Sequence, residues 1–454
     1  MQTKVYKKER KVEFSKIITV DFARSEGKIK PLGGLNAGPK LFACGREYDL
    51  TEDYRSMNIP VVRLADVDPP YGKNQLVDVH CIFPDLDADP EAPESYNFTE
   101  TDKYIAAVRD AGAEPVLRLG ESPDCYARKL YVKPPRDPDK WASVCEHIIM
   151  HYNEGFADGY KWKLRHVEIW DLPELECGFV GEAAELFELY ANVSARLKSR
   201  FPKLKIGGYG SLGFKGLNRL DASEAYKNSI AYAENFLAYQ KSAGGVVDFF
   251  TWYCFADSPE ELALHARYAR SVLDGQGFKR TASHVVGFNM ETARAGMYRG
   301  YAADLLASLI VAQRSGIEML IFEDARPFGE QNSLYTLDAD GVKYTSAREA
   351  LSAFGRLHAL GTAVESLGDS RRELYSLAAK GNGVAALAVA AREYSGKLEI
   401  RLKNAEYGSF SVRRIYEDEE CRAAERCRED IPLAGNKISL SLEGGDVYLL
   451  EFRA

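Results

Sequence analysis

The chain has 454 residues, of which 46% are hydrophobic and 11% aromatic, and a formal net charge of −8. A chain of this length exceeds the usual size of one hydrophobic core, so we expect one large domain and a smaller one. The net negative charge argues against nucleic acid and against an anionic membrane surface as general partners.

The first residues of the chain and the distribution of its cysteines bear on the cellular compartment in which we expect the protein. The basic residues among the first eight are not followed by an apolar run, so we expect no secretory signal. No window approaches the roughly 18 uninterrupted apolar residues of a membrane-spanning helix. The eight cysteines are scattered and form no Cys-x-x-Cys pair, which is typical of buried thiols in a reducing environment. The sequence therefore predicts a cytoplasmic protein.

Short β-rich runs alternate with amphipathic stretches from about residue 28 to residue 360. Each run is followed by a segment of helix length, which is the pattern of a (β/α)8 barrel, a parallel barrel with outer helices. The eight predicted strands are 29–35, 61–64, 114–119, 166–170, 205–209, 247–253, 282–288 and 318–322.

Local signals support the helices between these strands. Ser258-Pro259-Glu260-Glu261 is typical of a helix start, because serine caps the first turn and proline fits its first position. In segment 137–153, apolar residues recur at three- and four-residue steps and form one stripe. The stripe consists of Trp141, Val144, Cys145, Ile148, Ile149 and Tyr152.

After about residue 362 the pattern changes to short, often alternating runs separated by Gly, Asn and Asp. This pattern predicts an antiparallel β-sandwich that follows the barrel. We expect a barrel domain at 16–361 and a sandwich domain built from 1–15 and 362–454. The first 27 residues either join the sandwich or cover the bottom of the barrel.

The end of the fourth predicted strand is the most informative stretch. Strand 166–170 is followed by Asp171-Leu172-Pro173-Glu174. In a (β/α)8 barrel, the carboxyl ends of the strands carry the catalytic groups. We therefore expect the functional site at this rim.

The chain resembles glycoside hydrolase family 39, the family of β-xylosidases and α-L-iduronidases, from about residue 31 to its end. The order and spacing of several short motifs carry this resemblance. They are GGLNAGP at 33–39, VRL at 62–64, DVHCIFP at 78–84, LRLG at 117–120, EHIIMHYNEG at 146–155, IGG at 206–208 and DARP at 324–327.

The resemblance implies a retaining mechanism that uses two glutamates roughly 5 Å apart. The acid/base residue follows the fourth strand in a Trp-Asn-Glu-Pro motif, and the nucleophile lies at the end of the seventh strand. In this chain Asp171 and Leu172 occupy the Asn and Glu positions, and Gly287 occupies the nucleophile position. Tyr253 stands where the family tends to have His. We therefore expect that ordinary retaining hydrolysis is lost and that a carbohydrate-binding pocket remains.

Other carboxylates could rescue the chemistry. Asp171 either binds a sugar hydroxyl, acts as a displaced acid, or is a loop residue that caps a turn. Glu174 lies two residues beyond Leu172, and Glu291 lies four beyond Gly287. Glu323 ends the eighth strand, where the family usually has an aromatic residue, and with Asp171 it would make an improvised acid/base pair.

Arg63 matches a position that orients the nucleophile in related barrels. Without that carboxylate, it either pairs with Asp171 or Glu323 or binds an anionic ligand. His80 and Cys81 have no further ligands at metal spacing, so we expect His80 to line the pocket and predict neither a metal nor a cofactor. The predicted pocket residues are Arg63, His80, Asp171, Tyr253, Asn289, Glu323, Asp324 and Arg326.

Three functions remain open from the sequence. The leading one is a family 39-like protein that binds a monosaccharide or oligosaccharide without ordinary hydrolysis. The alternative is an active glycosidase on β-xylosides or related glycosides that uses Asp171, Glu174 or Glu323. The third is a structural subunit of an oligomer, and the resemblance also implies that a homo-oligomer can form.

Overall fold

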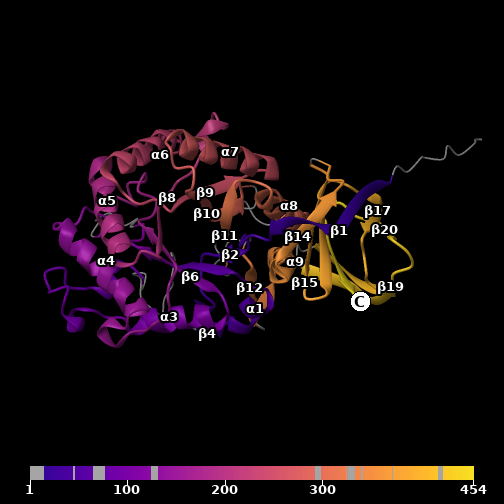
Figure 1. Ribbon diagram of the computed structural model, residues 1–454, viewed down its shortest axis with the longest axis horizontal. Helices are drawn as coiled ribbons and strands as arrows, with labels where there is room; N and C mark the ends of the chain where they lie inside the picture. Colours follow the sequence, from indigo (N-terminus) through magenta and orange to yellow (C-terminus); the bar gives the residue numbers. More distant parts are fainter. Residues whose placement is uncertain are drawn as a thin grey trace, which may run out of the picture.

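The computed structural model places two units beside each other, a barrel ringed by helices and a β-sheet unit built largely from the C-terminal part of the chain (Figure 1). Among the described helices, none has both the length and the apolar character needed to cross a membrane. The residues that the structure describes are 15–43, 46–64, 77–123, 131–291, 298–323, 325, 333–338, 341–370, 372–417 and 423–454.

Eight parallel strands close the barrel in the order β10-β11-β2-β5-β6-β7-β8-β9. This confirms the predicted (β/α)8 fold, because the strands follow the chain order around the barrel. Their bounds are β2 (Gly34–Leu35), β5 (Val61–Leu64), β6 (Glu114–Leu119), β7 (His166–Ile169), β8 (Lys205–Ser211), β9 (Phe249–Ala256), β10 (Ala282–Met290) and β11 (Ile317–Phe322).

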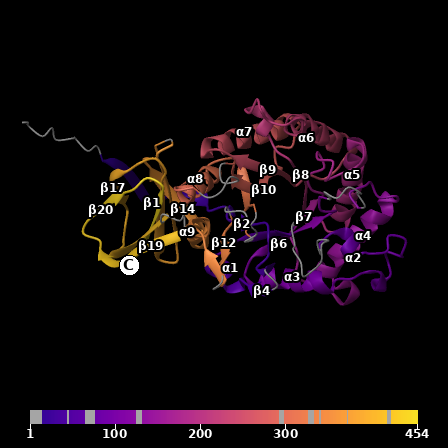
Figure 2. The ribbon, with the colours of Figure 1, turned by 180° about the vertical axis from the view of Figure 1, so that it is seen from behind.

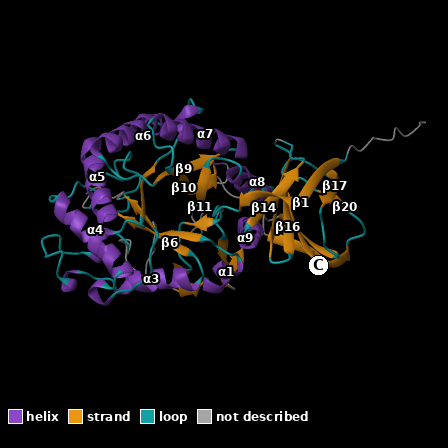
Figure 3. Cartoon of the chain, in the orientation of Figure 1, coloured by secondary structure: helices purple, strands orange, loops and turns teal. Residues whose placement is uncertain are grey.

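Helices cover the outside of the barrel, as the secondary-structure colours show (Figure 3). Helix α4 (Pro138–Asn153) begins where the Asp137 carboxylate accepts a hydrogen bond from the Lys140 amide at 3.0 Å. Helix α7 (Pro259–Gly275) begins at the predicted cap, where Ser258 Oγ accepts from the Glu261 amide at 3.2 Å. The others are α1 (Thr51–Ser56), α2 (Val79–Ile82), α3 (Thr99–Asp110), α5 (Ala183–Arg200), α6 (Glu224–Ala243), α8 (Tyr301–Gln313) and α9 (Ser346–Leu360).

Two β-hairpins and three 3-10 turns lie in the loops between the barrel elements. The hairpins are β3 (Lys40–Ala43) with β4 (Arg46–Asp49) and β12 (Tyr335–Asp338) with β13 (Gly341–Tyr344). The 3-10 turns are η1 (Pro93–Ser95), η2 (Phe156–Asp158) and η3 (Lys215–Leu217).

The second unit is one nine-stranded sheet in the order β19-β18-β21-β16-β15-β14-β1-β17-β20. All neighbours are antiparallel except β1 and β17. The sheet curls around a core of its own, so the expected β-sandwich is present. Its strands are β1 (Lys16–Lys28), β14 (Thr362–Leu367), β15 (Leu374–Gly381), β16 (Val384–Ala391), β17 (Gly396–Lys403), β18 (Ser409–Glu417), β19 (Ala423–Pro432), β20 (Lys437–Leu442) and β21 (Asp446–Arg453).

Strand β1 belongs to this sheet although it precedes the barrel in the chain. It lies between β14 and β17 and pairs with β17 through residues 16–21 and with β14 through residues 19–28. The expected barrel segment began at residue 16, but β1 makes its strand pairs outside the barrel. We therefore propose that the division between the two units lies after β1.

The two units share a packed interface. Because side chains alternate along a strand, Leu387 and Val389 of β16 face the sandwich core, whereas Ala386 and Ala388 join the core of the barrel unit with α8 and α9. The view from behind shows α8 and α9 between the barrel strands and the sheet (Figure 2). The Glu417 carboxylate accepts the Gly300 amide at 2.6 Å and the Ala302 amide at 3.2 Å, so β18 caps the start of α8.

Candidate functional site

The barrel interior changes from apolar to charged toward the carboxyl ends of its strands. Val61, Val116 and Ile321 belong to one apolar cluster inside the barrel. Two residues further along their strands, Arg63 and Arg118 also point inward and have no exposed surface. A buried charge is costly unless it is paired, so the partners of these arginines define the site.

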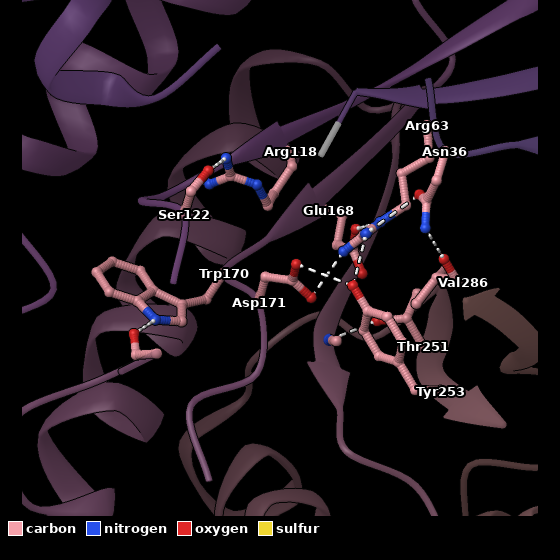
Figure 4. A network of polar contacts seen from close by, with 12 residues as sticks. Asn36, Arg63, Arg118, Ser122, Glu168, Trp170, Asp171, Thr251, Tyr253 and Val286 are labelled. Carbon is pink, nitrogen blue, oxygen red and sulfur yellow. Dashed lines mark hydrogen bonds and ion pairs between the residues drawn. The ribbon is translucent and has the colours of Figure 1, made fainter. Parts of the chain in front are cut away.

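Arg63 is bound by four side chains that come from three other strands or their ends (Figure 4). Its Nε donates to Glu168 at 2.5 Å, and its Nη2 forms an ion pair with Asp171 at 2.8 Å. Its Nη1 donates to the Tyr253 hydroxyl at 3.0 Å and lies 3.4 Å from Asn36 Oδ1. The Tyr253 hydroxyl in turn donates to Asp171 at 3.1 Å.

This network answers the question that the sequence left open for Arg63. The guanidinium is fully buried and forms ion pairs with Asp171 and Glu168, so these carboxylates rather than an anionic ligand balance its charge. Burial alone would lower the pKa of Arg63, but the charges of Asp171 and Glu168 raise it. Arg63 is therefore a permanent internal cation, and Asp171 serves first as its partner.

The segment after β7 places a hydrocarbon side chain at the predicted acid/base position. Trp170 and Leu172 both adopt left-handed backbone conformations, with φ of 69° and 48°, which are costly for residues with side chains. Leu172 packs against the apolar cluster that contains Tyr253. Asp171, between them, is 3% exposed, and burial raises its pKa while Arg63 opposes that rise. The segment after β7 thus places the hydrocarbon side chain of Leu172, and no carboxylate, at position 172.

The space at the predicted nucleophile position is already filled. A Cβ built on Gly287 would lie 2.3 Å from two ring atoms of Tyr253 and 2.6 Å from Glu323 Oε2. Contacts this short do not occur in folded proteins, so a side chain at 287 requires both neighbours to move. Asn36 Nδ2 holds Glu323 Oε2 at 2.5 Å and also donates to the Val286 carbonyl at 2.9 Å. Glu323 and Tyr253 together occupy the space that the first atoms of a side chain at position 287 would need.

The other rescue candidates are held at separate places. Glu174 accepts from Ser211 Oγ at 2.8 Å and from the Leu212 amide at 3.1 Å, so it is fastened to the end of β8. Burial raises the pKa of Glu174 to about 7, against the lowering effect of these hydrogen bonds. Glu291 forms an ion pair with Lys215 at 2.8 Å.

A second polar group lies at the ends of β5 and β6. Arg118 pairs with Asp78 and donates to Ser122 Oγ at 2.7 Å, while Ser122 Oγ donates to Asp78 at 2.7 Å. Glu121 accepts the His80 amide at 3.1 Å and bonds its Nδ1. Burial by itself lowers the pKa of His80, but Cys81 and Glu121 raise it to about 10, so the ring carries a charge at neutral pH. Burial raises the pKa of Glu121 to about 7.

His80 also has an aromatic neighbour and two possible co-ligands. Its ring stacks on that of Tyr131 with centroids 3.6 Å apart. One ligand atom each from Asp78, His80 and Glu121 lies within 4.8 Å of the others, so the expectation that His80 lacks partners at metal spacing was wrong. Asp78 is engaged by Arg118, however, and His80 by Glu121, so an ion would have to break two existing pairs.

Three predicted pocket residues remain. Asn289 is 2% exposed. Its side-chain oxygen accepts a hydrogen bond from the Tyr301 hydroxyl at the start of α8, and its side-chain nitrogen lies 3.5 Å from the Glu323 carbonyl oxygen. Asp324 and Arg326 lie outside the described residues.

Glu168, Arg118, Glu121 and Asn36 belong to the site, and sequence reasoning gave them no role in it. Glu168 and Arg118 did carry a signal, because each is a charged residue between apolar neighbours in a short buried strand. Such a residue must face the barrel interior and find a partner there. Glu121 and Asn36 lie just beyond strand ends, where the sequence pattern does not predict which way a side chain points.

Comparisons with known proteins agree with this architecture. Residues 40–241 match the family model described as Glycosyl hydrolases family 39. A beta-xylosidase from Geobacillus stearothermophilus is 28% identical over 149 residues, which cover 30% of this chain and 29% of that protein. The aligned part therefore spans less than a third of that relative.

Solved structures resemble nearly the whole chain. A glucosidase from Croceicoccus marinus superimposes with a TM-score of 0.79 at 21% identity, covering 97% of this chain and 99% of that one. A monomeric beta-xylosidase from Caulobacter crescentus gives a TM-score of 0.67 at 16% identity, with coverage of 97% and 99%. At these identities the likeness supports the fold alone.

Proposed function

We propose that this protein, whose residues 40–241 match the model of glycosyl hydrolases family 39, binds a carbohydrate at the mouth of its barrel without cleaving it by the retaining route. It is a β-xylosidase-related, family 39-like protein. The site that we assign to the sugar lies between the Arg63 network and the His80 group. Monosaccharides or oligosaccharides related to β-xylosides are the proposed ligands.

The observation that carries this proposal is the filled space at Gly287. Retaining hydrolysis needs a carboxylate that attacks the sugar, and without it no covalent intermediate forms. Tyr253 and Glu323 stand where that side chain would begin, which supports a lasting loss rather than a vacancy that a ligand could reopen. Leu172 removes proton delivery as well, which is worth roughly 10²–10⁴ in rate.

The proposal that binding persists rests on the other side of the mouth. Asp78, His80, Glu121 and Arg118 present donors and acceptors fixed by mutual hydrogen bonds. Tyr131, 40% exposed, adds an aromatic face beside His80. Fixed polar groups next to an aromatic ring are suited to hydroxyl-rich ligands, because each hydroxyl both donates and accepts.

The test measures turnover and binding on the same preparations. We expect no release of nitrophenol above buffer from aryl β-xyloside, β-glucoside or uronide substrates. Calorimetry with xylose and xylobiose should detect binding. Turnover that both Asp171→Asn and Glu323→Gln abolish would contradict the proposal, and so would a lack of binding to any of the sugars.

A second function is favoured by one observation, the carboxylate of Glu323 beside Gly287. Glu323 would then act as a relocated nucleophile, with Asp171 or Glu174 as the acid. Its Oε2 lies 2.6 Å from the Cβ position of residue 287, at the root of the missing side chain. A glutamate at 287 would carry its oxygens roughly 3 Å further along the chain of bonds. Because a 1 Å misplacement can cost about 100-fold in rate, we expect any such activity to be weak.

A further inference from the structure

A pocket of about 460 Å³ opens on the face of the barrel opposite the strand ends that form the site. Pro60 immediately precedes β5, Glu114 begins β6, and Arg165 immediately precedes β7, so the pocket lies at the amino ends of three neighbouring strands. Its lining consists of Pro60, Arg109, Gly112, Ala113, Glu114, Pro115, Trp162, Lys163, Leu164 and Arg165.

The lining carries an excess of positive charge. Arg109, Lys163 and Arg165 contribute three cations, whereas Glu114 is the one carboxylate of the lining. Glu114 is already engaged by Arg165 and by His166 at 2.7 Å. Burial raises the pKa of Glu114, but His166 and Arg165 lower it below its usual value, so it stays ionised. Within the described part of the chain, no ion pair joins Arg109 or Lys163 to a carboxylate.

This local charge is unusual for the molecule as a whole. The chain has a net charge of −8, so an excess of cations at one pocket is opposite in sign to the charge of the whole molecule. A pocket with two uncompensated cations is therefore a distinct electrostatic feature of this face.

The cations are held by a defined structure. The Arg109 guanidinium lies 5.2 Å from the centre of the Trp162 ring, and its Nη1 donates to the Trp162 carbonyl at 3.4 Å. The Trp162 ring stacks on Tyr160 with centroids 3.8 Å apart, and its amide donates to the Tyr152 carbonyl at 2.8 Å. The pocket wall is thus anchored to α4.

The backbone of this wall is strained at the cation itself. Lys163 has a φ of 61°, in the left-handed region that residues with a Cβ rarely adopt. Such conformations persist where the surrounding structure imposes them, and they cluster at ligand-binding sites. The left-handed conformation of Lys163 turns the backbone at the pocket wall, directly after Trp162, whose ring contacts Arg109.

We propose that this pocket binds a small organic anion that carries a carboxylate or a phosphate group. Arg109 supplies a planar pair of N–H donors, which matches either group, and Lys163 adds a second positive charge. The site is separate from the barrel mouth, because its lining shares no residue with the Arg63 network or the His80 group. The two ligands would therefore bind independently.

Calorimetry on the full chain at low ionic strength tests the proposal, with inorganic phosphate and glucuronate as separate probes and glucose as a neutral control. We expect binding of at least one anion and at least tenfold weaker binding in the Arg109→Gln/Lys163→Gln double variant. Lys161→Gln is the matched control, because Lys161 is exposed on the same loop and does not line the pocket. The tighter of the two anions identifies the preferred group.

Three results would overturn the proposal. They are no binding of either anion, equal binding by the double variant, and a loss of binding in Lys161→Gln as large as in the double variant. Thermal unfolding of each variant serves as the folding control. Lys161→Gln should match wild type because Lys161 is exposed, and the double variant should lose only the contacts of Arg109 with Trp162 and still unfold in one cooperative transition.

Discussion

The two sides of the barrel mouth differ in the polar side chains that they carry. On the side of β5 and β6, His80 is bonded to Glu121, and Arg118 is paired with Asp78. On the side of β7 and β10, an apolar residue and a glycine stand where the family resemblance implies the two catalytic glutamates. On our proposal, the groups for sugar recognition are retained on one side of the mouth, and those for bond cleavage have been lost on the other.

Charge balance explains how the second side tolerates its changes. The resemblance implies that Arg63 normally orients a glutamate at position 287, which is Gly287 here. A buried arginine that loses its carboxylate is strongly destabilising. Asp171, at a position where the resemblance implies asparagine, supplies a negative charge at 2.8 Å from Arg63 Nη2. On our proposal, Asp171 thus supplies a structural carboxylate in place of a catalytic one.

The largest predicted effect tests this structural role. We expect Arg63→Met to lower the free energy of unfolding by about 3–5 kcal/mol, because it leaves Glu168 and Asp171 buried without a cation. Urea unfolding measures the change. Arg165→Met is the matched control; its pair with Glu114 involves an arginine side chain that is 70% exposed, so we expect a loss of about 1 kcal/mol or less. If the two variants lose the same free energy of unfolding, the buried Arg63 pairs are no more important for stability than the exposed Arg165 pair.

A smaller effect, on the same side of the mouth, depends on pH. The pKa of Glu174 is about 7 in the folded protein against an ordinary 4.5, so between these values the folded state holds a proton that the unfolded state has released. Its contribution to stability is therefore present below pH 4.5 and is lost as the pH rises to about 7. We expect Glu174→Gln to gain about 1–3 kcal/mol over wild type at pH 8 compared with pH 5. Urea unfolding at both values measures it, and a gain that does not vary with pH would contradict the assignment.

The smallest predicted effect concerns the intact side. We expect His80→Ala to weaken xylobiose binding about tenfold, equivalent to about 1.4 kcal/mol, because it removes a charged donor from the proposed site. Cys81→Ala removes one neighbour of the imidazole ring but leaves His80 and its Glu121 partner in place, so it should leave the affinity within about twofold. Calorimetry compares the two variants with wild type. If Cys81→Ala has the larger effect, His80 does not contact the sugar.

The barrel could be predicted from sequence because its strands are short, apolar and evenly separated by helices. Strands β5 and β6 have the predicted bounds, and β7 ends one residue earlier than expected. Strand β1 was not predicted, because its last six residues are exposed and lack the apolar alternation of a buried strand. Its place depends on β14 and β17, which come more than 300 residues later.

The site was less predictable than the fold. The absence of glutamates at positions 172 and 287 can be read directly from the residues. The occupation of the space at Gly287 by Tyr253 and Glu323 cannot, because it depends on how strands β9, β10 and β11 stack side chains inside the barrel. Similarly, Glu121 reaches His80 through a turn whose direction no local pattern specifies.

The position of β1 has a consequence for how the chain is assembled during synthesis. This segment is synthesised before the barrel, yet its neighbours in the sheet are synthesised only after the whole barrel has been made. The sheet can therefore close only after β14 and β17 have been made, when the early strand inserts between these two later ones. A fragment that starts after β1 would present two open strand edges in the middle of the sheet, and such edges promote aggregation.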